Sequence, residues 1–318
     1  MQMTTSPLDN ALNRALQTRL ALQITLSSLP IVEEWMDIHL DRWLEHVPMP
    51  PDMPNGYNVT YLAGIGTDLR RMWWGAWGNP RGFVPKMADY FKLCNMAKSD
   101  EAILDQIGLA FEPELVGSWV GVWGGRVVTG WHFLDPHEFA KLEPLFGTHE
   151  AKFLLKKWAN DNGLEQFHRF QQSIGEAAFS EVELPMPGDS IDAQLDAASR
   201  SFQHFAGAPL GNAITGVLRA ANVAGLASAT RIHGGKVVKH SLLCEGISLE
   251  GVKELCQVAK APFDEKLDRI VNTMASEGIA RVEYGRSGEY SGVDIFVEPT
   301  EPAKKQTAAE TAKASVAN

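Results

Sequence analysis

The sequence has few cysteines. Cys94, Cys244 and Cys256 are the three in 318 residues, and no two of them have the Cys-x-x-Cys spacing of a redox or metal-binding pair. One would stay unpaired even if the other two were bridged, which argues against a disulfide-stapled scaffold and favours a reducing compartment. We therefore expect a cytoplasmic protein.

Positive charge is also in short supply. The 29 Lys and Arg residues face 39 Asp and Glu residues, giving a formal net charge of −10. This sign disfavours nucleic acid and anionic lipid as partners. Residues 1–30 contain no long apolar run, because Asp9, Arg14 and Arg19 interrupt it, so we expect neither a signal peptide nor a membrane span.

The complete motifs of three common enzyme classes are missing. In "HGGKVVKH" (233–240), Val237 follows the lysine where a phosphate loop needs Ser or Thr. "GIGTDLRR" (64–71) lacks the third glycine of a dinucleotide fingerprint. Ser190 in "GDSI" lies in a Pro-Gly linker, which favours a helix N-cap over an esterase nucleophile. No motif dictates a chemistry, and we expect no cofactor.

Histidine and carboxylate side chains come close together in "WHFLDPH" (131–137). His132, Asp135 and His137 are weak candidates for metal ligands, because imidazole and carboxylate groups both bind zinc. The two histidines straddle a predicted strand-to-helix junction, and no further ligand is evident. We therefore expect no metal site, although these three residues are the first to substitute if the protein is an enzyme.

Tryptophan is abundant, with nine residues, and two segments share the pattern Trp-x-Gly-x-Trp-Gly: "WWGAWG" (73–78) and "WVGVWG" (119–124). On a strand, this spacing places two indoles on one face with a glycine between them. The indoles could form an exposed platform for a partner, or a core in which the glycine admits a facing ring. The candidate partner-binding residues are Trp73, Trp74, Trp77, Trp119, Trp123 and Trp131.

A short pattern recurs in the chain, "GGRVV" at 124–128 and "GGKVV" at 234–238. A shift of 110 positions overlays residues 101–136 on residues 211–246 without a gap. Each copy has an amphipathic helix and then two alternating runs joined by Gly-Gly. Because glycine adopts positive φ at both central positions of a type I′ turn, two β-hairpins are predicted.

Each predicted hairpin is followed by a helical stretch with a proline, Pro144 or Pro262, and then by a second hairpin. The unit is therefore helix, hairpin, kinked helix, hairpin. The expected division of the chain is a helical, Trp-rich N-terminal segment (1–99), a first unit (100–185), a linker and lead-in helix (186–207), a second unit (208–299) and a disordered tail (300–318).

The second unit carries a family resemblance. "VAGLASATRIHGGKVVKHSLL", the helix from Ser248 and the strands at 279–298 resemble the roadblock/dynein-light-chain family, a profilin-like α/β sandwich. The predicted fold class is then α+β, with two tandem roadblock/profilin-like units. The resemblance implies a non-enzymatic scaffold or regulator that works by self-association or by binding a protein partner, either a small GTPase or the other members of a multi-subunit assembly.

Two alternatives of other classes stay open. Residues 248–299 also read as a winged helix, in which Lys266, Arg269 and Arg286 would contact DNA phosphates, although acidic side chains crowd the same helix. The third hypothesis is an enzyme with an aromatic-lined pocket.

Overall fold

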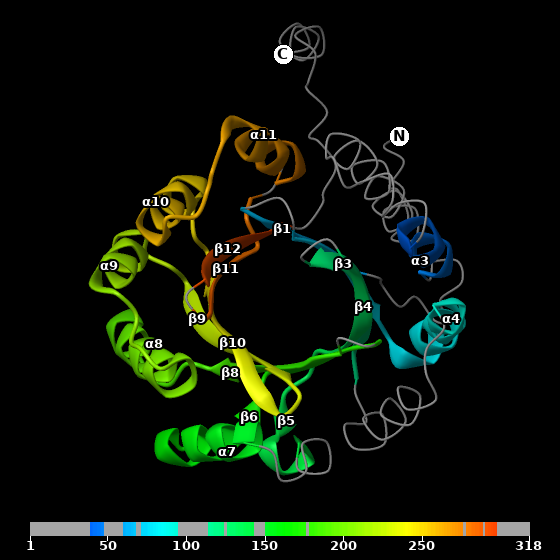
Figure 1. Ribbon diagram of the computed structural model, residues 1–318, viewed down its shortest axis with the longest axis horizontal. Coiled ribbons are helices and arrows are strands. Elements are labelled where there is room, and N and C mark those ends of the chain that lie inside the picture. Colours follow the sequence, from blue (N-terminus) through cyan, green and yellow to red (C-terminus); the bar gives the residue numbers. More distant parts are fainter. Residues whose placement is uncertain are drawn as a thin grey trace, which may run out of the picture.

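The fold is built around a closed barrel of ten strands (Figure 1). The computed structural model describes residues 39–47, 60–67, 71–94, 114–123, 126–142, 150–175, 178–275, 278–288 and 290–297. The barrel strands are β1 (Thr60–Gly66), β2 (Met72–Gly78), β3 (Val116–Trp123), β4 (Arg126–Phe133), β7 (Arg169–Ser173), β8 (Ser180–Pro185), β9 (Gly225–His233), β10 (Lys236–Glu245), β11 (Arg281–Ser287) and β12 (Tyr290–Val297).

Every pair of neighbouring barrel strands is antiparallel. The order around the barrel is β1-β12-β11-β10-β9-β8-β7-β4-β3-β2, and β2 pairs with β1 to complete the ring. The seam between the first and last barrel strands is the β1–β12 pair, where Ala63 faces Val297 and Gly66 faces Asp294. The closed barrel has no free strand edge.

Helices surround the barrel on the outside, as Figure 1 shows. They are α3 (Asp41–His46), α4 (Pro80–Leu93), α7 (Glu150–Asn162), α8 (Ile191–Ala206), α9 (Asn212–Ala220), α10 (Leu249–Ala259) and α11 (Glu265–Met274). A two-stranded sheet of β5 (His137–Glu138) and β6 (Gln166–Phe167) and the 3₁₀ helix η4 (Phe139–Leu142) lie beside them. The predicted N-cap at Ser190 and the predicted helix start at Ser248 are confirmed, since both hydroxyls accept hydrogen bonds from backbone N–H groups, at 3.2 and 3.1 Å.

Alternation along the strands produces two separate hydrophobic clusters. Outward side chains such as Trp74, which is fully buried, join the helices in the larger cluster between barrel and helices. A smaller cluster lies inside the barrel and consists of Leu62, Trp73, Trp119, Phe179 and Phe296. The barrel is therefore packed on both of its faces.

The glycine in each Trp-x-Gly-x-Trp segment makes room for a neighbour. A Cβ atom on Gly75 would lie 2.5 Å from Cη2 of Trp73, so the indole lies against the backbone of its own strand. A Cβ atom on Gly121 would lie 2.5 Å from the backbone oxygen of Met72 on the adjacent strand. The motif thus allows large rings to lie along the inner wall of the barrel.

The predicted hairpins are confirmed. β3 pairs with β4, β9 with β10, β7 with β8, and β11 with β12. Gly234 and Gly235 have φ values of 55° and 74°, as the turn requires. Gly124 and Gly125 lie outside the described residues. The break at Pro262 is also observed, because it lies between the end of α10 and the start of α11.

The predicted fold class of two tandem roadblock/profilin-like units is wrong. β4 pairs with β7, β8 with β9 and β12 with β1, so hairpins from both stretches join one barrel. The alternation of residues and the turn glycines in the sequence predict only which two strands pair within one hairpin. Pairing between hairpins leaves no trace in the alternation, because an edge strand of a separate sheet and an inner strand of a barrel carry the same pattern.

The winged-helix alternative is also corrected. The hairpin that would form the wing is β11–β12. It forms part of the barrel sheet, between β10 and β1. Arg286 donates hydrogen bonds to the backbone oxygens of Ala208 and Pro209, at 3.3 and 3.4 Å. Lys266 and Arg269 lie on α11, outside the barrel. The guanidinium of Arg286 therefore ties β11 to the segment after α8.

Some expectations fall on residues that the structure does not describe: most of the predicted N-terminal helices, Pro144 and the tail at 300–318. Within the described part of the chain, no helix has the length and apolar character needed to cross a membrane.

Candidate active site

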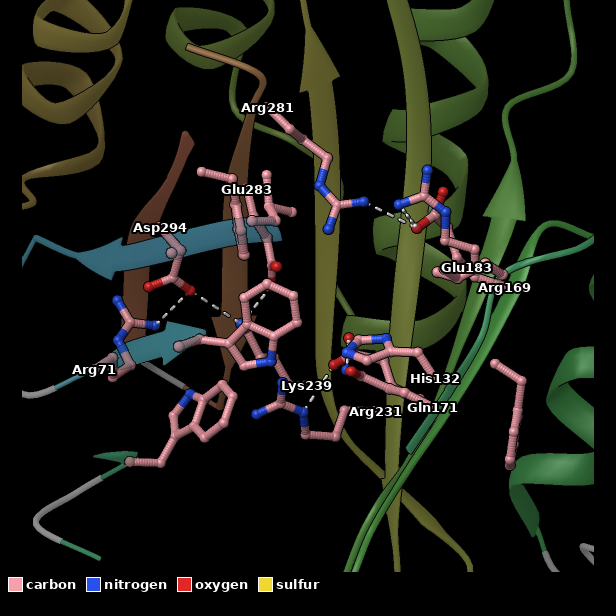
Figure 2. Close-up of a pocket in the computed structure, with 18 of the residues that line it drawn as sticks. Arg71, His132, Arg169, Gln171, Glu183, Arg231, Lys239, Arg281, Glu283 and Asp294 are labelled. Atoms are coloured by element: carbon pink, nitrogen blue, oxygen red, sulfur yellow. Dashed lines mark hydrogen bonds and ion pairs between the residues drawn. The ribbon is translucent and has the colours of Figure 1, made fainter. Parts of the chain in front are cut away.

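The interior of the barrel contains a cavity of about 220 Å³ (Figure 2). One part of its wall comes from β1 to β4 and is mostly apolar. Leu62, Trp73, Trp77 and Trp123 line it, and His132 adds one polar ring. The rest of the wall comes from β7 to β12 and is mostly charged.

The aromatic side chains form a connected set. The ring of Trp73 lies 6.5 Å from that of Trp119 and meets Phe296 edge-on at 5.7 Å, measured between centroids. Trp119 stacks on Phe179 at 5.9 Å and has no exposed surface. Trp119 therefore supports the rings that line the cavity, and Trp73 presents its indole to it.

The charged wall carries more cations than carboxylates. Its cations are Arg71, Arg169, Arg231, Lys239 and Arg281, and its carboxylates are Glu181, Glu183, Glu283 and Asp294. All except Arg71, which precedes β2, lie on strands β7 to β12. Each of these nine groups has an oppositely charged partner, as buried charges require. Only the side chain of Arg169 is more than a third exposed among them.

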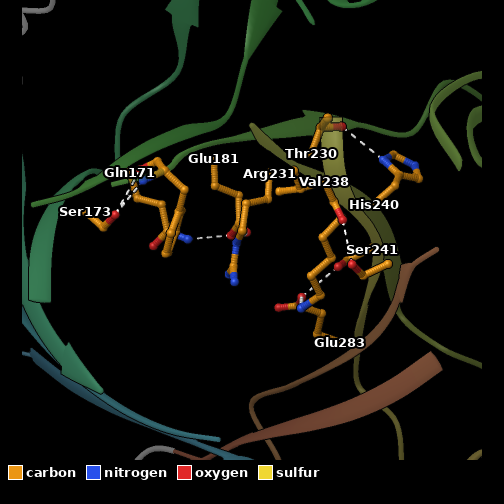
Figure 3. Close-up of polar contacts among 12 residues, drawn as sticks. Gln171, Ser173, Glu181, Thr230, Arg231, Val238, His240, Ser241 and Glu283 are labelled. Atoms are coloured by element: carbon orange, nitrogen blue, oxygen red, sulfur yellow. Dashed lines mark hydrogen bonds and ion pairs between the residues drawn. The ribbon is translucent and has the colours of Figure 1, made fainter. Parts of the chain in front are cut away.

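The first group of charges is centred on Lys239. Its Nζ lies 2.5 Å from Oε1 of Glu283 and 3.5 Å from Oδ2 of Asp294. The hydroxyl of Ser241 also donates to Glu283, at 2.7 Å (Figure 3). Arg71 reaches Asp294 from the start of β2, with 3.2 Å between Nη1 and Oδ2. This group closes the barrel interior across the β1–β12 seam.

A β-bulge orients Lys239. The register of β10 against β9 shifts between Val237 and Lys239. As a result, Val237 packs against the outer cluster while Lys239, two residues on, lines the cavity. The hydroxyl of Ser287 donates to the backbone oxygen of Val238 at 2.7 Å and holds the bulge in place.

The second group joins the charged wall to the aromatic wall. Nε of Arg231 lies 2.8 Å from Oε2 of Glu181, and the side-chain amide of Gln171 donates to Oε1 of the same carboxylate at 2.5 Å (Figure 3). The guanidinium carbon of Arg231 lies 4.1 Å from the ring centroid of Phe179 and 5.0 Å from that of Trp123. These are cation–π distances.

The third group is held by Glu183. Its Oε2 accepts a hydrogen bond from Arg281 at 3.1 Å and lies 3.7 Å from Nη1 of Arg169. Arg281 also stacks over Phe296, with 4.9 Å between its guanidinium carbon and the ring centroid. Figure 2 shows Arg281, Glu183 and Arg169 beside one another, on three different strands.

Burial shifts the pKa values of these groups in different directions. It would by itself raise the pKa of Glu283, but Lys239 and Arg231, with the hydrogen bonds from Lys239 and Ser241, lower it to about 2. Burial raises the pKa of Asp294 above its usual value in spite of the same cations. Burial, with the charges of Arg169 and Arg281, holds the pKa of His132 well below its usual value, so this imidazole is neutral at pH 7.

The structure separates the residues of the "WHFLDPH" segment. His132 lines the cavity, whereas Asp135 lies outside the barrel and accepts backbone hydrogen bonds from Glu114 and Leu115. His137 packs against Phe167 of the small sheet at 5.7 Å. In the portion of the chain that the structure describes, no group of three potential ligands could hold a metal ion.

The six candidate tryptophans divide between the two faces of the barrel. Trp73, Trp77 and Trp123 line the cavity, and Trp119 packs behind them. Trp74 and Trp131 belong to the outer cluster, where Trp131 lies 4.6 Å from Phe91 of α4. A role for the six in binding a protein partner stays a prediction, as do self-association and a small GTPase partner.

Sequence reasoning missed the charged wall. The signal was present, because β8 carries Glu181 and Glu183 and β11 carries Arg281 and Glu283 at a spacing of two residues. A strand with charges on one face and apolar residues on the other normally places its charges in solvent. Only closure of the barrel makes that face an interior.

No family model matches the chain. It is similar to a PH domain-containing protein of Dictyostelium discoideum, with 23% identity over 263 residues, which is 80% of this chain and 57% of that protein. The chain thus spans little more than half the length of this relative.

Several solved structures are similar to the whole described fold. They include the NotF prenyltransferase (TM-score 0.61, 8% identity, 94% of this chain and 96% of that one) and PriB in complex with product diphosphate (0.60, 13%, 91% and 96%). A third is the 5-dimethylallyl tryptophan synthase of Streptomyces coelicolor in complex with DMASPP and Trp (0.55, 11%, 94% and 96%). The chain has the fold of these prenyltransferase barrels.

These similarities correct the roadblock resemblance and what it implied. The predicted non-enzymatic scaffold rested on a profilin-like sandwich, and the chain instead has a barrel shared with synthases and prenyltransferases. Of the three sequence hypotheses, the enzyme with an aromatic-lined pocket agrees best with the barrel interior.

Proposed function

We propose that this protein is an enzyme that transfers an allylic prenyl group from a diphosphate donor to an aromatic small molecule inside the barrel. The observation that carries the proposal is the division of one cavity in the barrel into an indole-lined wall and a wall with five cations. The shared fold supports it, because structures with this barrel have been solved with DMASPP and with diphosphate.

The charged wall suits the diphosphate of the donor. A guanidinium group can donate two parallel hydrogen bonds to the oxygens of one phosphate, and the ammonium group of a lysine adds a compact positive charge. Lys239 on β10, Arg231 on β9 and Arg71 just before β2 line the cavity from different places, so together they could surround an anion. Their neutralisation of the negative charge that builds up on the leaving group would lower the barrier.

The aromatic wall suits the other half of the reaction. An allylic donor develops positive charge at its C1 carbon, and the face of an indole stabilises a cation within about 6 Å. Trp73 and Trp123 offer such faces beside the cationic wall. The rings also keep water away from the reactive carbon, which would otherwise be hydrolysed.

The proposed reaction balances without an added oxidant or reductant. The bond between C1 and oxygen breaks, and its electron pair leaves with the diphosphate. A ring carbon of the acceptor gives an electron pair to C1 and forms the new carbon–carbon bond. The proton from that ring position passes to a carboxylate of the charged wall, and the aromatic ring is restored.

The test is turnover of dimethylallyl diphosphate with tryptophan and a panel of indole and phenol acceptors, followed by mass spectrometry and diphosphate release. We expect Lys239→Met to weaken binding of inorganic diphosphate at least ~10-fold, because it removes a cation from the cavity wall. Lys236→Met is the matched control, since this lysine lies on the same strand and is exposed. No prenylated product and no diphosphate binding would overturn the proposal.

A further inference from the structure

Two carboxylates face each other inside the barrel. Glu283 on β11 is the direct cross-strand partner of Asp294 on β12, and both are buried. Like charges at directly opposed positions destabilise a sheet, and burial increases the penalty. Other charges of the wall must therefore offset the repulsion between these two carboxylates.

The cations compensate the two carboxylates unequally. Glu283 accepts close hydrogen bonds from Lys239 and Ser241, at 2.5 and 2.7 Å. Asp294 has longer contacts, 3.2 Å to Arg71 and 3.5 Å to Lys239, both through Oδ2. Among the described residues, its Oδ1 has no hydrogen-bond partner. Asp294 is thus the less tightly held member of the pair.

We propose that Asp294 is an internal counterion that takes the position of an anion between Arg71 and Lys239, and that it takes up a proton when the donor diphosphate displaces it. This inference rests on the proposed function. It explains why a buried wall meant for an anion carries a carboxylate in contact with two of its cations (Figure 2).

The proton follows from the charges that surround Asp294. The facing groups are Arg71 beside β2, Lys239 on β10, Arg231 on β9 and Glu283 on β11. Once a diphosphate contacts Arg71 and Lys239, the carboxylate faces Glu283 and the ligand, both negative. A buried carboxylate beside like charges holds a proton. The proton comes from solvent and returns to it when the diphosphate leaves, so diphosphate binds more weakly as pH rises.

The experiment is calorimetry of the full chain with inorganic diphosphate in buffers of different ionisation enthalpy, which counts the protons taken up. We expect wild-type protein to take up about one proton more than Asp294→Asn, because the amide cannot titrate. Without the internal anion, Asp294→Asn should also bind diphosphate ~10-fold more tightly at pH 8. Equal proton counts in the two proteins would overturn the inference.

Glu183→Gln is the matched control. Glu183 is a carboxylate of the same wall, but it contacts Arg281 and Arg169 and neither Arg71 nor Lys239. We expect this variant to keep the wild-type proton count, and a loss of the proton in it would move the role from Asp294 to Glu183. If Asp294→Asn does not fold, the pH dependence of the wild-type affinity for diphosphate decides. Once the protonation of diphosphate itself is subtracted, an affinity that does not change with pH would contradict proton uptake by the protein. Failure of all three proteins to bind diphosphate would contradict the proposed function itself.

Discussion

At the scale of single residues, Gly75 makes room for the indole of Trp73, which lines the cavity. Trp73 lies over Gly75 so closely that a methyl group at this position would overlap its six-membered ring. The indole can lie this close to the wall because Gly75 has no side chain. A single methyl group at position 75 would therefore change both the packing of Trp73 and the free volume of the cavity.

We expect Gly75→Ala to lower the free energy of unfolding by about 1–3 kcal/mol and to weaken acceptor binding, because it pushes Trp73 into the cavity. Gly216→Ala on α9 is the control, since a Cβ atom there meets nothing within 4 Å. This control should raise stability, by up to about 1 kcal/mol. Urea unfolding of both variants measures the difference, and equal stabilities would show that Trp73 moves without cost.

His240 gives a pH dependence to stability. It lies between the barrel and α8, bonded to the hydroxyls of Ser201 and Thr230 at 3.0 and 2.9 Å. Burial, with the charge of His204, lowers its pKa to about 3. The unfolded chain binds a proton at about pH 6.5 that the folded chain does not, so stability is complete above this pH and is lost as pH falls toward 3.

We expect the free energy of unfolding to fall by up to about 1.4 kcal/mol per pH unit from this residue between pH 6 and pH 4. His240→Gln should be less stable at pH 7 but show a shallower slope. Urea unfolding at several pH values measures both, and parallel slopes for the two proteins would contradict a neutral, buried His240.

At the scale of elements, local patterns predicted more than pairings between elements. The hairpins, the break at Pro262 and the N-caps followed from turn glycines, proline and hydroxyl groups, which act within a few residues. The β1–β12 seam joins segments more than 200 residues apart and has no local signal. Trp-x-Gly-x-Trp drew attention to three indoles that line the cavity, Trp73, Trp77 and Trp123, but as candidates for binding a protein partner. The charged half of the candidate site was missed.

The helix before β11 offers a test of how much an N-cap outside the barrel contributes to stability. Asp264 is the N-cap of α11 and accepts a hydrogen bond from the backbone N–H of Leu267 at 2.8 Å. We expect Asp264→Ala to cost about 1 kcal/mol of stability and Asp264→Asn to retain most of it, because asparagine also caps helices. Thermal unfolding compares the two, and an equal loss in both would assign the effect to charge alone.

At the scale of the whole molecule, the protein has two interiors of opposite character. The shell between barrel and helices is apolar, and the barrel interior is partly ionic. Ion pairs of this kind contribute little net stability, since desolvation offsets their attraction. The weak net stabilisation expected from the charged wall agrees with the proposed role of this wall in binding a diphosphate.

Intrinsic fluorescence tests this arrangement in solution. Because Trp43, Trp74 and Trp119 are fully buried, we expect blue-shifted emission with little quenching by iodide. Dimethylallyl diphosphate should change the emission of the indoles that line the cavity, and Trp73→Phe should reduce that change. Red-shifted, readily quenched emission would contradict the closed barrel.

The seam between β1 and β12 also dictates when the cavity comes into existence. Its wall draws on strands from residue 60 to residue 297, and the last of them pairs with the first. During synthesis at about 5–20 residues per second, earlier hairpins can form while the ring is still open. The nascent chain must therefore keep two sheet edges unpaired and the charged wall open to solvent until β12 arrives, which makes this interval the period of greatest exposure to aggregation and chaperone capture.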